Sequence, residues 1–189
     1  HSHGMTTMLV TNGTLPKVIE KLDTLPTQLY VSVDAPNKEV FDEICRPKWN
    51  SAAWDKFEET IDLLPSLDTR IVCRHTLIKG RNMNPEHIPQ YAALDNRADP
   101  DWIECKGYVH VGNSRENLTA ENMPFHEDIL EFSRTLAPLT DRKLLDDSPP
   151  SRVALVGKEI IPIPIPEATM QFPEDLGIAK SIKHLKIVQ

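Results

Sequence analysis

The sequence predicts an α/β fold that forms a partial (βα) barrel with parallel strands. Segments typical of strands alternate with helices of about 10–14 residues, which is the pattern of βαβ units joined by right-handed crossovers. Polar residues recur where four successive strands end, and a parallel barrel builds its active site at that position. Polar residues at any single strand end could simply form a turn, so the prediction rests on their recurrence at four strand ends. No glycine-rich dinucleotide loop follows these strands, which favours a barrel over a Rossmann sheet.

The first two thirds of the chain hold the alternating elements. In chain order we expect strands over 8–13, 28–33, 69–77 and 101–105, and helices over 15–22, 38–44, 52–64, 85–94 and 124–136. Pro16 falls in the first turn of its helix, where proline is tolerated, and Asn37 and Ser51 are suitable N-caps for the next two helices. The helix after Ser51 has apolar residues at helical spacing, which we expect in the core: Trp54, Phe57, Ile61 and Leu64.

The later elements differ from this alternation. Pro124 is expected at the first position of its helix, whose apolar face comprises Phe125, Ile129, Phe132 and Leu136. Two extended segments, 142–145 and 152–156, are separated by a turn-forming stretch, so we expect a hairpin or an edge pair.

A proline-rich segment follows the hairpin. Isoleucine and proline alternate over 160–166, and alternate prolines remove the donors that a central strand needs. We therefore expect an extended segment on the surface, followed by a terminal helix over 175–187. The predicted organisation is a barrel domain over 1–157 and a second region over 158–189 that contains this segment and helix.

The composition indicates a soluble globular protein of one domain. The 189 residues carry a formal net charge of −7, which argues against a wholly basic surface for nucleic acids but leaves room for a local one. The apolar runs are too short to cross a membrane, and no secretory leader is visible. Cys45, Cys73 and Cys105 follow no metal or disulfide spacing, so we expect a reducing cytoplasmic location and no metal ligands.

Several motifs, read together, resemble a known enzyme family. The stretches that carry the resemblance are Leu9-Val10-Thr11-Asn12-Gly13-Thr14, Gln28-Leu29-Tyr30-Val31-Ser32-Val33-Asp34-Ala35, Arg46-Pro47, Arg74-x-Thr76-Leu77-x-Lys79-x-x-Asn82, Glu104-x-Lys106-Gly107 and Asn122-Met123-Pro124-Phe125-His126-Glu127. From its start to about Val156, the chain resembles the radical S-adenosylmethionine superfamily and, within it, the 4-demethylwyosine synthases of tRNA wybutosine synthesis.

The resemblance implies an activity and its cofactors. Members of this family bind S-adenosylmethionine and two 4Fe-4S clusters, and they join two carbons of pyruvate to N1-methylguanosine in phenylalanine tRNA. The cysteine triad and the acidic methionine-binding segment of the family's first two strands have no counterpart in this sequence. The resemblance therefore implies a partial barrel without its first strands or cluster ligands, inactive by itself.

The resemblance and the strand ends together give the candidate site residues. Those expected to bind the cofactor are Asn12, Ser32, Asp34, Thr76 and Asn82, and those expected to bind substrate are Lys79, Arg81 and His126. Lys106 is the catalytic candidate, because a lysine amine can hold the ketone of pyruvate as a Schiff base. Two alternative roles stay open: Asp34 as the cap of the next helix, and Lys106 as a structural residue or a phosphate contact. Arg74, within a strand, needs a partner such as Asp34 or Glu104.

Two other classes of function remain open at this point. The chain could be a tRNA- or protein-binding module derived from such a barrel, or a lyase that uses Lys106 without a cluster. The expected partners are tRNA and pyruvate but no membrane. Self-association is also expected, since a partial barrel exposes sheet edges.

Overall fold

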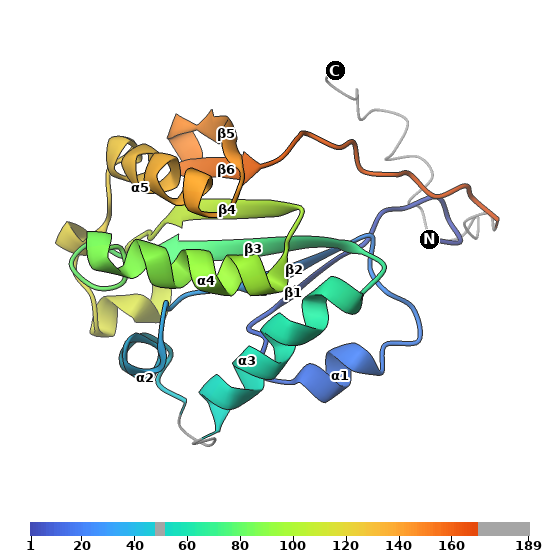
Figure 1. Cartoon of the computed structure of the whole chain (residues 1–189), viewed down its shortest axis with the longest axis horizontal. Coiled ribbons are helices and arrows are strands. Elements are labelled where there is room, and N and C mark those ends of the chain that lie inside the picture. Colours follow the sequence, from blue (N-terminus) through green and yellow to red (C-terminus); the bar gives the residue numbers. More distant parts are fainter. Residues whose placement is uncertain (48–51, 170–189) are drawn as a thin grey trace.

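The computed structural model describes residues 1–47 and 52–169 and contains a single six-stranded sheet within them (Figure 1). The strands lie in the order β1-β2-β3-β4-β6-β5. Their bounds are β1 Met8–Thr11, β2 Gln28–Ser32, β3 Arg70–Leu77, β4 Trp102–Gly107, β5 Lys143–Ser148 and β6 Val153–Gly157. Strands β1 to β4 pair in parallel, while β6 pairs antiparallel with both β4 and β5. The predicted partial barrel of parallel strands is confirmed, as is the hairpin at its end.

The helices connect the parallel strands as crossovers. Their bounds are α1 Pro16–Glu20, α2 Lys38–Cys45, α3 Ala53–Leu63, α4 Ile88–Ala98 and α5 His126–Leu139. Short 3-10 turns lie at Leu64–Ser66, Pro85–His87, Gly112–Glu116, Ala120–Asn122 and Pro149–Ser151. The long loop between β4 and α5 holds two of these turns, Gly112–Glu116 and Ala120–Asn122.

The core lies between the sheet and the helices, which cover one face of it (Figure 1). Burial alternates along the central strands because successive side chains point to opposite faces. The covered face contributes Leu29, Val31, Cys73, Ile103 and Cys105, and α3 contributes Trp54, Phe57 and Ile61. The four core residues predicted for this helical stretch are all buried, and so are two of the three cysteines.

Two helix starts test the capping predictions. The Asn37 side chain accepts a hydrogen bond from the Val40 amide at 3.0 Å, which confirms it as the N-cap of α2. The placement of Pro124 in a first helical turn is wrong: α5 begins at His126, because the Asp128 carboxylate accepts the Phe125 amide at 2.8 Å and makes Phe125 the N-cap. Ser51 lies outside the described residues.

The elements at the carboxyl end differ in detail from expectation. Asp146 and Asp147 belong to β5 rather than to the turn, which is formed by Pro149–Ser151. The segment over 160–166 forms no strand, as the prolines predict. It runs along the strand starts of the sheet, where Arg70 donates to the Pro162 carbonyl at 2.7 Å. The helix predicted over 175–187 lies outside the described residues.

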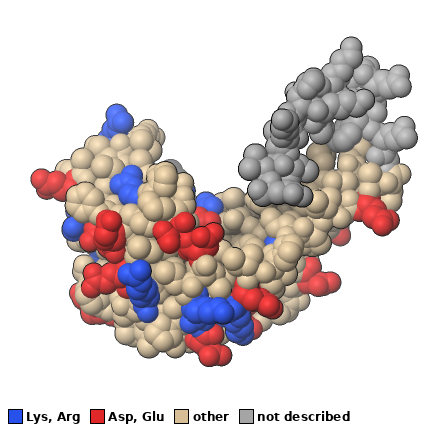
Figure 2. Space-filling view, turned by 90° about the horizontal axis from the view of Figure 1, so that it is seen from above, with Lys and Arg blue, Asp and Glu red and all other residues tan. Residues whose placement is uncertain are grey.

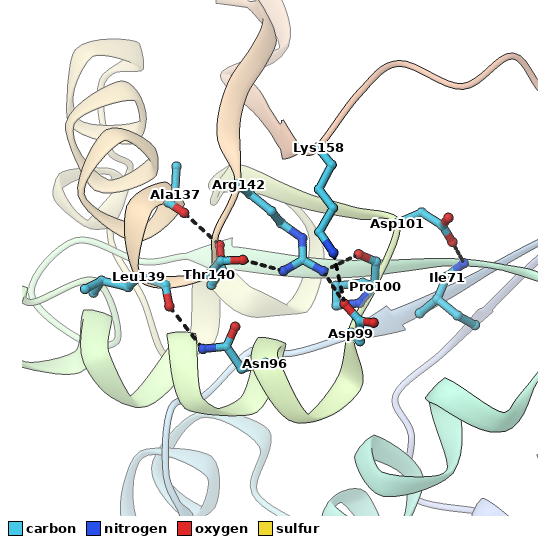
Figure 3. A network of polar contacts seen from close by, with 10 residues as sticks. All are labelled: Ile71, Asn96, Asp99, Pro100, Asp101, Ala137, Leu139, Thr140, Arg142 and Lys158. Carbon is cyan, nitrogen blue, oxygen red and sulfur yellow. Dashed lines mark hydrogen bonds and ion pairs between the residues drawn. The ribbon is translucent and has the colours of Figure 1, made fainter.

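Arg142 joins three chain segments at the edge of the sheet where β4 begins (Figure 3). Its buried guanidinium donates to the Thr140 and Pro100 carbonyls, both at 2.7 Å, and to the Asp99 carboxylate at 2.9 Å. Asp101 accepts the Ile71 amide at 2.8 Å in the same region. This network fixes the start of β4 and of β5, and with it the register at which β4 presents its side chains.

Across both described ranges, no helix is long and apolar enough to cross a membrane.

Candidate active site

The second face of the sheet, which we call the open face, carries polar and aromatic side chains on β2, β3 and β4. The strand register arranges them in three rows: Tyr30, Val72 and Trp102; Ser32, Arg74 and Glu104; Thr76 and Lys106. Nearly all of these residues are half-buried, whereas their neighbours along each strand are buried under the helices. The third row lies closest to the carboxyl ends of the strands, where a parallel sheet places ligands.

Lys106 stands in this third row with a free ammonium group. Its backbone pairs with Thr76 on β3 and with Val153 on β6. Within the described part of the chain, its side chain has no hydrogen bond and no ion pair. A strand fixes the backbone of Lys106, yet nothing neutralises its amine, which leaves that amine available to a ligand. The strand extends to Gly107, beyond the predicted end at 105, so Lys106 lies within β4 rather than after it.

Asp34 follows β2 and presents an unsatisfied acceptor. Its Oδ1 atom is buried and has no hydrogen-bond partner. Burial raises the pKa of this carboxyl, and hydrogen bonds from the Thr76 side chain and backbone oppose the rise. A buried acceptor without a partner costs free energy unless a ligand donates to it. Asp34 therefore suits a group with hydroxyl or amine donors, such as a ribose.

Arg74 occupies the middle row and has the partner that its strand position requires. Its Nε donates to Glu104 Oε1 at 2.8 Å, and its guanidinium lies over the Tyr30 ring at 4.6 Å from the centroid. Burial raises the pKa of Tyr30, and the Glu104 charge adds to this rise. Of the two partners expected for Arg74, the structure selects Glu104.

Two of the predicted cofactor residues are engaged with the protein itself. Asn12 follows β1, and its side-chain oxygen accepts from the Thr14 amide at 3.1 Å and from the Thr14 hydroxyl at 2.8 Å. Asn82 is fully buried: it accepts from the Ile78 amide at 2.6 Å and donates to the Asp34 and Thr76 carbonyls, both at 2.8 Å. Asn82 thus ties the loop after β3 to two strand ends, which positions Asp34 and Thr76.

The predicted substrate residues do not lie on the strands of the open face: Lys79 and Arg81 follow β3, and His126 begins α5. Lys79 Nζ is 3.5 Å from the Asp128 carboxylate and 5.5 Å from the centroid of the Phe125 ring, at the start of α5. His126 Nε2 pairs with Asp147 at 2.8 Å, while its Nδ1 is buried without a partner.

Arg81 faces a different element. It pairs with Glu43 of α2 and lines a cavity of about 440 Å3 together with Arg46, Ser114 and Asn117. The structure therefore brings Ser32, Asp34, Thr76 and Lys106 together and distributes Lys79, Arg81 and His126 around them.

A second cavity, on the open face, involves residues that the sequence reasoning missed. It has a volume of about 270 Å3 and is lined by Tyr30, Trp102, Glu104, Asp146, Asp147, Ser148, Val153 and Leu155. The period-two alternation of the strands carries the signal that would have found Tyr30 and Trp102, because both occupy the same face as Lys106. Asp146 was assigned to a turn, and only its pairing with Leu155 brings it to this face.

The three cysteines do not fit an iron–sulfur cluster. Cys73 and Cys105 are buried on the helix-covered face, whereas Cys45 is exposed at the end of α2. Burial raises the pKa of the Cys73 thiol well above its usual value. Cluster ligation requires thiolates that converge. In the described residues, no group of three histidine, cysteine or acidic side chains is placed to hold a metal ion.

Comparison with known proteins identifies a matching family model and similar proteins. Residues 97–158, which include β4 and the β5–β6 hairpin, match the family model for wyosine base formation. The chain is 42% identical over 164 residues to the S-adenosyl-L-methionine-dependent tRNA 4-demethylwyosine synthase of Pyrococcus horikoshii, a match that covers 84% of this chain and 47% of the relative. This chain is a relative of the tRNA 4-demethylwyosine synthases. The resemblance inferred from the motifs is confirmed.

Further relatives agree with this assignment. The enzyme of the same description from Methanocaldococcus jannaschii is 41% identical over 159 residues, covering 84% of this chain and 49% of that protein. Among solved structures, TYW1 with a lysine-pyruvate adduct bound superposes with a TM-score of 0.72 at 38% identity, covering 82% of this chain and 49% of that one. A crystal structure of archaeal TYW1 gives 0.64 at 35% identity, covering 81% and 46%. The chain thus spans about half the length of these archaeal relatives.

Proposed function

We propose that this chain provides the substrate-binding face of a 4-demethylwyosine synthase, in which Lys106 holds pyruvate for addition to N1-methylguanosine of phenylalanine tRNA. One observation carries the proposal: at the carboxyl end of a parallel strand, the Lys106 side chain has no hydrogen bond or ion pair with any described residue. The wyosine base formation match includes it, and a solved relative is described with a lysine-pyruvate adduct.

Lys106 would capture pyruvate as an imine. The neutral amine adds to the keto carbon, and loss of water leaves a carbon–nitrogen double bond to the lysine. Thr76 is the backbone partner of Lys106 on β3, but its hydroxyl already donates to Asp34, so it does not hold the carboxylate of the captured acid. Arg74 does not compete for this anion, because Glu104 already pairs with it.

The neighbouring polar groups fit S-adenosylmethionine. Ser32 and Asp34 would hold its ribose and amino groups, and the unpartnered Asp34 oxygen is the observation that supports this fit. When bound in the family's complete enzymes, this cofactor supplies the radical that removes hydrogen from the substrate methyl group. Because the cysteines do not fit a cluster, we assign to this chain the residues that hold the cofactor and the substrates, and none that hold a cluster.

The tRNA would approach over the loops at the carboxyl ends of the strands. Lys79 and Arg81 lie in the loop after β3, His126 begins α5, and these three residues are the proposed contacts. Figure 2 shows basic and acidic residues interspersed rather than separated by sign on one face of the molecule. Local contacts of this kind would position a specific RNA more than they would drive non-specific binding. The proposed activity belongs in the cytoplasm, and the unpaired state of all three cysteines fits this location.

Reductive trapping tests the role of Lys106. The chain is incubated with labelled pyruvate and borohydride, and the modified peptide is identified by mass spectrometry. We expect label on Lys106 at close to one equivalent and its loss in Lys106→Ala. The control is Lys17→Ala, which removes an exposed lysine of α1. Label that persists in Lys106→Ala, or that lies on Lys79, would end the assignment of the adduct to Lys106.

A further inference from the structure

We propose that the cavity of about 270 Å3 on the open face binds the guanine base that the enzyme modifies, and that Tyr30, Trp102, Glu104 and Asp146 recognise it. This inference rests on the proposed function and deepens it, because it assigns a subsite to one substrate.

The aromatic walls suit a planar ring. Tyr30 and Trp102 both line the cavity and lie in the same row of the sheet. A guanidinium lies over each ring, Arg74 over Tyr30 and Arg70 over Trp102, with both at 4.6 Å from the ring centroid. Each arginine fixes the orientation of its ring, which lowers the entropy cost of stacking a base. Stacking of a base on an aromatic side chain is worth about 1–3 kcal/mol.

The acceptors favour guanine over pyruvate. Glu104 is 14% exposed and uses one oxygen for Arg74, while Asp146 is exposed and accepts the Asp147 amide at 2.9 Å. Both carboxylates retain oxygens that only accept, so they select a ligand edge that donates. N1-methylguanine offers its exocyclic 2-amino group there. Pyruvate is an anion, and two carboxylates repel it.

The position of the cavity places its occupant beside the proposed pyruvate site. Val153 lines the cavity and is the backbone partner of Lys106 across the β4–β6 pair. Seven of the eight lining residues, all but Tyr30, fall within the 97–158 match to wyosine base formation. A base held here would turn its amino edge toward the acids and lie next to the pyruvate from which it must receive two carbons.

A pair of RNA hairpins isolates the contact to the amino group. Both carry the anticodon stem-loop of phenylalanine tRNA; one has N1-methylguanosine and the other N1-methylinosine, which lacks only the 2-amino group. Fluorescence anisotropy measures the affinity of the chain for each. We expect the wild type to prefer N1-methylguanosine by about tenfold, the usual effect of a lost hydrogen bond to a charged group. Asp146→Ala and Glu104→Gln should each reduce this preference severalfold.

Controls and contrary outcomes follow from the geometry. Asp55→Ala removes an exposed carboxylate of α3, away from the open face, and should keep the full preference. Equal affinity of the wild type for both hairpins would overturn the inference. So would variants that lose S-adenosylmethionine binding while they keep the preference, because the cavity would then belong to the cofactor. Loss of the Lys106 adduct with the preference intact would instead count against the proposed function alone.

Discussion

At the scale of single residues, the sheet separates two kinds of charged group. The open face carries Lys106 without a partner and Arg74 paired with Glu104. The covered face buries a second pair, in which His75 Nε2 lies 3.1 Å from Asp95 Oδ1 and both side chains are inaccessible to solvent. The His75 ring also stacks on Tyr91, with centroids 4.6 Å apart. The charged groups of the open face are accessible to ligands, whereas the buried His75–Asp95 pair contributes to the free energy of unfolding.

The His75–Asp95 pair should make the free energy of unfolding decrease at alkaline pH. Burial lowers the pKa of His75, but the Asp95 charge and hydrogen bond outweigh it and raise the pKa from 6.5 to about 10. A raised histidine pKa means that the stabilisation is complete below about pH 6.5 and is lost as the pH rises through about 10. Urea unfolding across this range should show the decline. Asp95→Asn should lower the unfolding free energy by about 3 kcal/mol at neutral pH, and it should reduce the alkaline decline. An unchanged decline would assign it to other groups.

At the scale of elements, Arg142 determines how the two halves of the sheet meet. Its guanidinium holds the turn after α4 and the turn after α5 at the place where β4 and β5 begin (Figure 3). Arg142→Met keeps the apolar length of the side chain but leaves the Pro100 and Thr140 carbonyls without this donor. We expect a loss of about 2–3 kcal/mol in urea unfolding. Lys143→Met, at the exposed next residue, is the matched control and should change stability by less than about 0.5 kcal/mol. Equal effects of the two would refute the role of Arg142.

At the scale of the whole molecule, β1 is an open edge of the sheet. Among the residues that the structure describes it pairs only with β2, and Met8 and Val10 are 56% and 57% exposed. An unpaired edge with apolar side chains is a template for pairing with another chain. We predict concentration-dependent self-association in light scattering, which Val10→Lys should suppress. Val18→Lys, on α1 at an equal 57% exposure, should leave it unchanged. A monomer at all concentrations, or suppression by both variants, would contradict pairing through β1.

The sequence by itself determined the class of fold, most elements and the resemblance to the family. Periodicity identified the core residues of α3 and the strands of the parallel sheet, because these depend on local spacing. The sequence also indicated Lys106 as the catalytic candidate, because the end of a strand is a local feature.

The tertiary structure alone decided how these residues meet. It selected Glu104 over Asp34 as the partner of Arg74, enclosed Asn82 in backbone contacts, and brought Asp146 opposite Leu155. It also showed that Lys79 and Arg81 in the loop after β3, and His126 at the start of α5, pair with other elements. The physical reason is register: which side chains become neighbours depends on how the strands align. That alignment is fixed by contacts between residues far apart in the chain.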